Sequence, residues 1–121
     1  MTETVSIAPE ELARCVENAL DDGKAVDIRV LKVGEMTVIT DYMIIASGRS
    51  ARQVRALADR VRETAHDLGA QIIGMEGAGD AEWVLIDLGD VVAHIMQFDT
   101  REFYQLEKLW EAHAPVQADI L

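Results

Sequence analysis

The chain has 121 residues, of which half are apolar and 27% are charged, a composition that excludes a disordered or fibrous protein and predicts one globular domain. A domain of this size buries roughly two thirds of the surface of its unfolded chain, so we expect a self-sufficient core. The formal net charge of −11 would repel phosphate backbones and anionic lipids, so we expect neither nucleic acid nor a membrane as the main partner.

The N-terminal region predicts a tail at residues 1–8, followed by an amphipathic helix. The tail carries acidic side chains instead of a basic signal segment, and no part of the chain has the ~20 consecutive apolar residues that cross a bilayer, so we expect a cytoplasmic protein. From Pro9 to Asp22, apolar residues recur at helical spacing, and Gly23 suits the end of the helix. Cys15, the single cysteine, lies on this stripe and is expected to be a buried, inert thiol.

Two extended segments follow, at residues 25–33 and 36–47, in which Val, Ile and Thr are frequent. Gly34 and Glu35 separate the segments and supply a turn. We therefore predict two strands that pair as a hairpin.

A second amphipathic helix is predicted after Ser50. Ser50 and Gln53 form the capping pattern S-x-x-Q ahead of an apolar helical stripe, and Gly69 supplies the C-terminal stop. The helix and its N-terminal flank contain five of the chain's eleven basic residues: Arg49, Arg52, Arg55, Arg60 and Arg62. Asp59 and Glu63 partly neutralise this cluster, so a solvated helix face is favoured over a binding site.

Three further strands are predicted in the second half of the chain. A short strand at residues 70–75 precedes the Gly-rich acidic loop 76–82. Residues 82–97 then predict two strands joined by a two-residue turn at Gly89 and Asp90. These strands form the second predicted hairpin of the fold.

One face of this second hairpin is a candidate for function. Because side chains alternate along strands, the face opposite the apolar one holds six side chains: Trp83, Leu85, Asp87, Val92, His94 and Met96. Trp83 is expected directly across from Met96, and Leu85 across from His94. Aromatic and apolar anchors mixed with polar groups are typical of a protein-binding hot spot, although burial of this face under a helix is the alternative.

Residues 101–114 predict a third helix that closes the fold. Its core-facing stripe is expected to be Phe103, Leu106, Trp110 and Ala114, which leaves Tyr104 on the polar side. The order α-β-β-α-β-β-β-α predicts an α/β (α+β) fold, in which a mixed five-stranded sheet with flanking helices forms a single domain. The domain is expected to span residues 9–114, and residues 115–121 form a C-terminal tail.

The part of the chain that contains the second hairpin and the third predicted helix is strongly acidic. From Glu76 to Glu111 there are nine acidic and two basic residues, so this segment contributes −7 of the total charge of −11. A face that combines apolar anchors with such a field would steer a basic protein toward it and hold it by desolvated aromatic contacts.

The residues do not assemble a known catalytic motif. His94 has no HExxH pattern or cysteine cluster beside it, so we expect no metal site and no cofactor. Ser47 and Gly48 resemble the Gly-Ser corner of nucleotidyltransferases, but those enzymes bind metal on a close pair of carboxylates, whereas the candidates here, Asp41, Asp87 and Asp90, are scattered in the sequence. A nucleotidyltransferase-like phosphotransfer enzyme that uses Ser47, Gly48, Asp41 and Asp87 with magnesium is the alternative hypothesis, and a homodimerising scaffold is a third.

Three stretches together resemble the ribosomal silencing factor family, also called Iojap-related proteins: ITDYMIIASGRSARQV, EGAGDAEWVLIDLGDVVAHIMQ and REFYQLEKLW. The resemblance runs from about Val26 to Trp110 and includes the order of helices, strands and turns. It implies a fold similar to that of nucleotidyltransferases without their catalytic carboxylates, and a protein that is not an enzyme.

The resemblance also implies a function and a set of contact residues. A factor of this kind binds the large ribosomal subunit through ribosomal protein L-fourteen, blocks association with the small subunit and represses translation under nutrient limitation. The family's contacts come from the tryptophan of its EW strand and from a Tyr-x-Leu-Glu-Lys motif, which correspond here to Trp83, Tyr104, Leu106, Glu107 and Lys108. Asp87 and Met96, which share the hairpin face with Trp83, complete the predicted partner-binding residues. A homodimer of the free protein is also compatible with the resemblance.

Overall fold

The computed structural model describes residues 7–112 of the chain. Most of the tail predicted at residues 1–8, the tail predicted at residues 115–121 and the predicted core residue Ala114 therefore lie outside the described residues. Within the described part of the chain, no helix is both long enough and apolar enough to pass through a bilayer.

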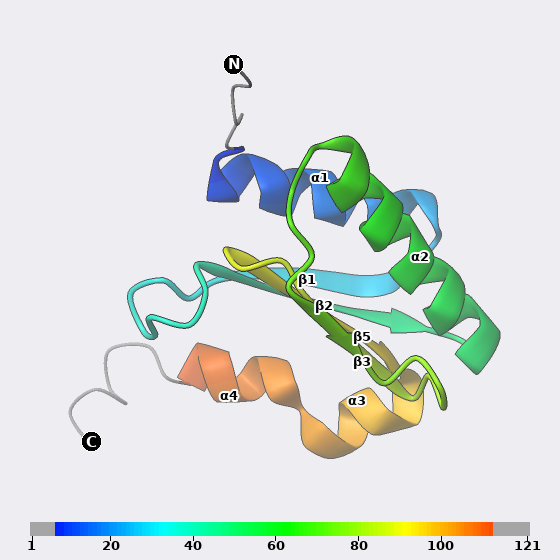
Figure 1. Ribbon diagram of the computed structural model, residues 1–121. Helices are drawn as coiled ribbons and strands as arrows, with labels where there is room; N and C mark the ends of the chain where they lie inside the picture. The colour runs from blue at the N-terminus through cyan, green and yellow to red at the C-terminus, as the bar shows by residue number, and fades with distance from the viewer. Residues whose placement is uncertain (1–6, 113–121) are drawn as a thin grey trace.

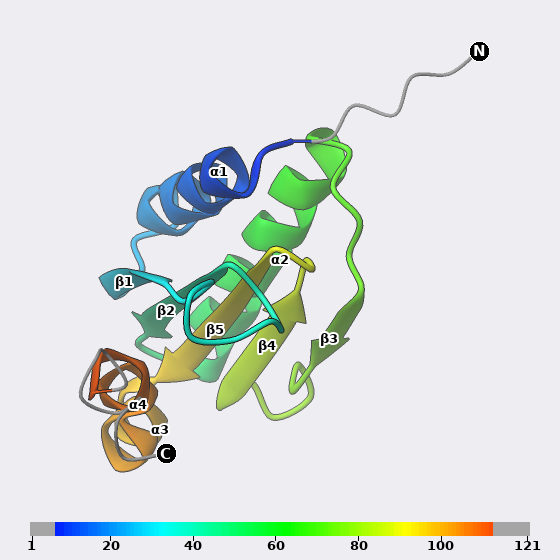
Figure 2. The same ribbon diagram turned by 90° about the vertical axis from the view of Figure 1, so that its left-hand side faces the viewer.

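A mixed sheet forms the centre of the molecule. Its strands are β1 (Val26–Lys32), β2 (Tyr42–Gly48), β3 (Gly74–Glu76), β4 (Trp83–Asp87) and β5 (Val91–Gln97). They lie in the order β1-β2-β5-β4-β3, as Figure 2 shows. β2 and β5 pair in parallel and every other neighbouring pair is antiparallel, which confirms the predicted five-stranded mixed sheet.

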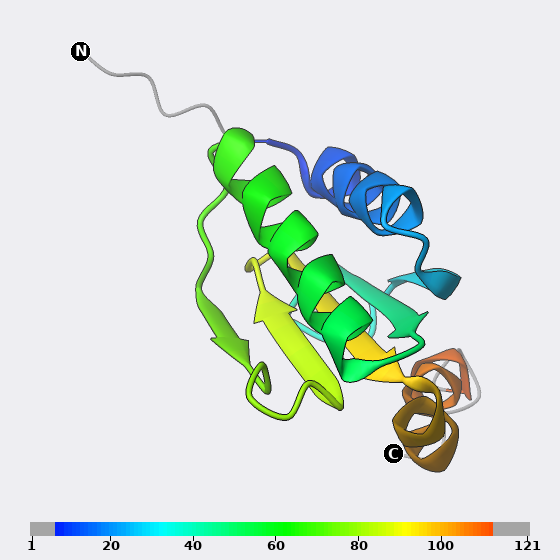
Figure 3. The same cartoon turned by 90° about the vertical axis from the view of Figure 1, so that its right-hand side faces the viewer.

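The helices form a layer on each side of the sheet. α1 (Pro9–Asp22) and α2 (Ala51–Asp67) cover one face, and α3 (Phe98–Tyr104) and α4 (Leu106–Ala112) lie on the other side (Figure 1). Figure 3 shows α2 lying over the sheet beside α1. The main core lies between this helix pair and the sheet, where the apolar stripes of both helices meet buried aliphatic side chains such as Ile44, Val84 and Ile95.

The ends of the first two helices follow the predicted signals. Pro9 lies in the first turn of α1 and Gly23 caps its end. The Ser50 hydroxyl accepts a hydrogen bond from the backbone N–H of Gln53 at 3.1 Å, which confirms the cap of α2. Cys15 is half-buried on α1 rather than fully enclosed, with its thiol 3.8 Å from a carboxylate oxygen of Glu11.

The connection between β1 and β2 is longer than predicted. The two strands pair antiparallel as expected, but residues 36–41 are irregular instead of continuing the second strand. The Thr37 hydroxyl accepts a hydrogen bond from the backbone N–H of Ile39 at 3.1 Å. Such local bonds compete with strand pairing, and here they leave the side chains of Val38 and Ile39 in solvent.

The third predicted helix is two short helices. α3 begins at Phe98, and the break falls at Gln105, which has the left-handed angles φ 48° and ψ 49°. The side chains after the break therefore do not continue the spacing of one helix. The prediction that Phe103 belongs to the core is wrong, because its side chain is 79% exposed. Leu106 and Trp110 do pack inward, as predicted.

A smaller core lies on the α3 and α4 side of the sheet. Its buried members come from β2, β5 and the end of β1: Val33, Met43, Ile45 and Met96. Leu31, Trp83, Leu106 and Trp110 pack against them and are partly buried. This second core holds the short helices near the candidate face of the hairpin.

Both outer strands of the sheet are short or irregular. β3 has three residues. In β1 the pairing register with β2 shifts between Val26 and Arg29, and Asp27 within this bulge has a φ of 51°.

Candidate protein-binding face

The hairpin of β4 and β5 has the predicted register. Trp83 pairs with Met96 and Leu85 pairs with His94. The turn contains Gly89 at a φ of 87°, a left-handed conformation that suits glycine. The neighbouring residues of β4 point into the main core, so Trp83 lies on the face turned away from α1 and α2.

Trp83 lies at the centre of a ring cluster on this face. Its indole and the Tyr104 ring are 4.9 Å apart between centroids, tilted by 53°. Phe103 contacts Tyr104 edge-on, also with 4.9 Å between centroids. Trp83 is half-buried, whereas Tyr104 is 56% exposed. Trp83, Phe103 and Tyr104, which we call the aromatic face, therefore present ring surface to solvent at one place, although they come from β4 and α3.

His94 orients the indole from the sheet side. The Trp83 Nε1–H donates a hydrogen bond to His94 Nδ1 at 2.9 Å, and the two ring centroids are 5.8 Å apart. Burial lowers the pKa of His94 from 6.5 to about 4, so the imidazole is neutral at pH 7. Because Nδ1 accepts, the proton of the neutral ring sits on Nε2, which is buried without a hydrogen-bond partner among the described residues. His94, a residue of a type that often binds metals, instead supports the tryptophan here.

The remaining predicted hairpin residues differ in exposure. Met96 is fully buried in the second core, so the expectation that it contacts a partner is corrected: its side chain supports the surface from below. Asp87 is half-buried, and its carboxylate accepts a hydrogen bond from the Gly89 backbone N–H at 2.8 Å. Asp87 thus stabilises the turn with one of its oxygens.

The predicted motif on α3 and α4 is divided between inward and outward side chains. Lys108 is exposed. Leu106, which is predicted both as a core residue and as a contact residue, is half-buried at the rim of the second core. The Glu107 side chain is 16% exposed and accepts a hydrogen bond from Arg101 Nε at 3.1 Å. Its carboxylate is thus already engaged within the protein, which the sequence did not indicate.

Exposed acidic side chains flank the residues of the aromatic face along the chain. Glu82 precedes Trp83 in the chain, Glu102 precedes Phe103, and both side chains are exposed. Asp80 and Asp99 are also exposed in the adjoining segments. The segments that carry the aromatic rings therefore also carry exposed negative charge, a combination expected for docking onto a basic protein.

The residues of the alternative enzyme hypothesis are not brought together. Asp41 precedes β2 and Asp87 ends β4, at the same end of the sheet, because β4 runs antiparallel to β5 and β5 runs parallel to β2. Ser47 and Gly48 end β2, six residues along the strand, roughly 20 Å away. The Ser47 hydroxyl is also buried and bound to Arg101. Within residues 7–112, no three His, Cys, Asp or Glu side chains form a cluster that could hold a metal ion.

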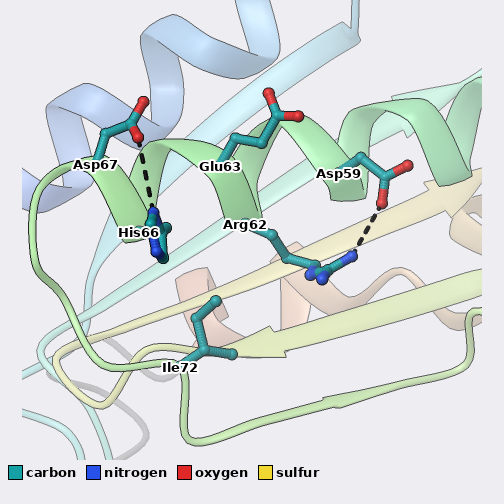
Figure 4. Close-up of a pocket in the computed structure, with 6 residues that line it drawn as sticks. All are labelled: Asp59, Arg62, Glu63, His66, Asp67 and Ile72. Atoms are coloured by element: carbon teal, nitrogen blue, oxygen red, sulfur yellow. Dashed lines mark hydrogen bonds and ion pairs between the residues drawn. The ribbon is translucent and has the colours of Figure 1, made fainter.

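Three of the five clustered arginines, Arg49, Arg55 and Arg62, have local partners, as the predicted solvated face implies. Figure 4 shows Arg62 pointing toward Asp59, with a nitrogen–oxygen distance of 3.2 Å, beside exposed Glu63 and His66. Arg55 donates to the backbone carbonyls of Ala78 and Gly79 at 3.1 and 2.6 Å, which ties the acidic loop to α2. The shallow pocket of Figure 4 thus mixes charges of both signs and favours no particular ligand.

Comparisons with known proteins point to one family. Residues 6–120 match the family model described as "Ribosomal silencing factor during starvation". Over 120 residues the chain is 38% identical to a ribosomal silencing factor from Zymomonas mobilis, covering 96% of this chain and 90% of the relative. A more distant mouse relative, named "Mitochondrial assembly of ribosomal large subunit protein 1", is 36% identical over 87 residues, covering 69% of this chain and 38% of the relative. A crystal structure of a Chromobacterium violaceum protein superposes with a TM-score of 0.85 at 40% identity, covering 87% of this chain and 88% of that one.

Proposed function

Because this chain belongs to the ribosomal silencing factor family, we propose that it binds the large ribosomal subunit through ribosomal protein L-fourteen and prevents the small subunit from joining. Translation is then repressed by occlusion when nutrients are scarce. The name of the mouse relative, which refers to assembly of the ribosomal large subunit, supports the choice of subunit.

The ring contact between Trp83 and Tyr104 carries the proposal. The two rings come from different elements and meet at a distance of 4.9 Å on the surface. Aromatic side chains that are partly exposed and held rigidly lose little entropy on binding, and they are enriched at interface hot spots. The exposed acids of the neighbouring segments supply the charge that complements a basic ribosomal protein.

We propose that the protein acts without catalysis and without a cofactor. Asp41 and Asp87 lie at the opposite end of the sheet from Ser47 and Gly48, so these residues cannot act on one phosphate group. Calorimetric titration with magnesium and a nucleoside triphosphate separates the hypotheses, because the phosphotransfer enzyme would give saturable heat.

A sedimentation experiment tests the proposed function. Tagged protein is incubated with purified large subunits and centrifuged through a sucrose gradient, and joining of small subunits is followed by light scattering. We expect co-sedimentation with the large subunit and loss of joining in proportion to the bound fraction. Absence of the protein from the large-subunit fraction, or joining at full extent when it is bound, contradicts the proposal.

The same preparation addresses partner and self-association. Purified ribosomal protein L-fourteen should bind the chain directly and compete with large subunits. Analytical ultracentrifugation of the free protein shows whether a homodimer forms, and the proposal expects large subunits to displace any dimer that uses the aromatic face.

A further inference from the structure

Arg101 is the buried residue of α3, a helix whose other side chains are exposed or half-buried. Its side chain is 8% exposed. An enclosed guanidinium cannot meet a partner directly, and its burial is costly unless its donors are paired within the protein. The pairing of Arg101 therefore indicates what the residue does.

The guanidinium joins α3 to three other elements. Nη1 donates to the Ser47 hydroxyl of β2 at 2.9 Å and lies 3.4 Å from the Val26 carbonyl of β1. Nε donates to Glu107 of α4 at 3.1 Å. Nη2 forms an ion pair with Asp27 of β1 at 3.3 Å, without the alignment of a hydrogen bond. We call Arg101, Glu107, Ser47 and Asp27 the Arg101 clasp.

Paired residues of three strands form one row across the sheet. Trp83 of β4 pairs with Met96 of β5, and Met96 pairs with Ser47 of β2. The aromatic face lies at the Trp83 end of this row, and the clasp lies at its Ser47 end. Arg101 and Tyr104 lie one helical turn apart on α3. Arg101 binds Ser47 at one end of the row, and the Tyr104 ring contacts the Trp83 ring at the other end. α3 is therefore fixed across the row at two points, with Met96 buried between them.

Arg101 also bridges the break between the two short helices. Its backbone carbonyl accepts from the Gln105 N–H at 2.8 Å, and its side chain binds Glu107 two residues beyond the break. Helices of seven residues, such as α3 and α4, are not stable alone, so their placement depends on tertiary contacts. The clasp supplies polar contacts of this kind on both sides of Gln105.

We infer that Arg101 is a positioning residue that holds Tyr104 against Trp83, and that Glu107 acts inside the clasp instead of on the partner. The effect on ribosome binding rests on the proposed function. The effect on ring geometry does not, because the rings and the clasp belong to the free protein.

The first test is spectroscopic and uses the full chain without a partner. Nuclear Overhauser contacts between the Tyr104 ring and the Trp83 indole are recorded for the wild type, Arg101→Met, Glu107→Gln and the control Arg62→Met. Arg62 is an exposed arginine that also pairs with a carboxylate, at 3.2 Å. We expect the ring contacts to persist in the control, to weaken in Glu107→Gln and to disappear in Arg101→Met. Intact ring contacts in folded Arg101→Met overturn the inference; if that variant does not fold, intact contacts in Glu107→Gln do so.

The second test measures affinity for purified large subunits. Arg101→Met is expected to weaken binding roughly ten-fold or more, and Arg62→Met to leave it unchanged. In a Tyr104→Ala background, Arg101→Met should add almost no further loss, because both changes remove the same ring. A full additional loss in that background overturns the inference, since Arg101 would then act separately from Tyr104. If the wild type does not bind large subunits, the proposed function fails, and the ring contacts alone decide the role of Arg101.

Discussion

The Trp83 indole is held from two directions, by a hydrogen bond from its Nε1–H to His94 and by the Tyr104 ring. A ring fixed in this way is ordered before a partner arrives, so little free energy is lost in ordering it on binding. The proposed affinity therefore originates in individual side chains, above all in the fixed Trp83 ring.

Replacing either ring tests this view of the affinity. Trp83→Ala and Tyr104→Ala should each cost about 2 kcal/mol or more of binding free energy, which is roughly a thirty-fold loss of affinity. Affinity for purified large subunits is measured by equilibrium sedimentation, with Ile73→Ala as the control. Ile73 is an exposed apolar residue next to β3, outside the aromatic face. Unchanged affinity in folded Trp83→Ala would remove Trp83 from the interface.

The buried imidazole of His94 predicts a pH dependence of stability. Its pKa is 6.5 in the unfolded chain and about 4 in the folded protein. As the pH falls below 6.5, the unfolded chain takes up the proton first, so the contribution of His94 to the free energy of unfolding decreases until about pH 4 and then levels off. The decrease contributed by this group approaches about 3 kcal/mol.

Urea unfolding between pH 7 and pH 4 measures this contribution. His94→Asn has no titrating ring, so the difference in unfolding free energy between wild type and variant should shrink as the pH falls. Parallel pH profiles of the two proteins would show that the imidazole does not titrate with a lowered pKa.

At the scale of elements, the placement of β4 depends on a close approach by Gly77. Gly77 has a φ of 91°, and a Cβ there would overlap the backbone carbonyl oxygen of Trp83. Gly69 has a similar φ of 75° but open space around it. Gly77→Ala should therefore lower the free energy of unfolding by about 1 kcal/mol or more beyond the effect of Gly69→Ala. Chemical denaturation of the two variants checks this, and equal losses would mean that the contact with Trp83 is not tight.

A helix end or a turn can be predicted from the sequence when the residues that determine it are neighbours in the chain. The Ser50 cap and the turn at Gly89 and Asp90 depend on neighbouring residues, so their sequence signals were sufficient. The break at Gln105 has no such signal, because glutamine has no preference for left-handed angles. Phe103 was assigned to the core on the assumption that the helix was continuous.

Parts of the candidate site also could not be predicted from local sequence patterns. The pairing of Trp83 with Met96 follows from the two-residue turn and from strand alternation, but the contact of Tyr104 with Trp83 requires α3 to cross the sheet. Arg101 looks like an ordinary polar helix residue, and its burial depends on Ser47, 54 positions earlier in the chain. Contacts at such separations are fixed by the assembled fold and not by periodicity.

At the scale of the whole molecule, the net charge of −11 should govern how fast a partner is found. The exposed acids around the aromatic face attract a basic protein over about a Debye length, which shortens as salt is added. We expect the association rate with ribosomal protein L-fourteen to fall about ten-fold between about 0.05 M and 0.5 M salt, with a smaller change in dissociation. Stopped-flow fluorescence measures both rates.

A charge variant gives the matched comparison for this prediction. Asp80→Asn combined with Glu82→Gln removes two exposed charges near Trp83 while keeping similar shapes. The salt dependence of association should be shallower in this variant. An association rate of the wild type that does not respond to salt would show that diffusion is not electrostatically steered.

The two outer strands have a consequence for the protein at high concentration. An unpaired strand edge can recruit a strand from another chain and so start fibril growth. Here the β3 edge offers three residues, and the β1 edge is kinked at the bulge that contains Asp27. Neither edge offers a long, straight template, so the molecule should withstand high concentration without converting into amyloid.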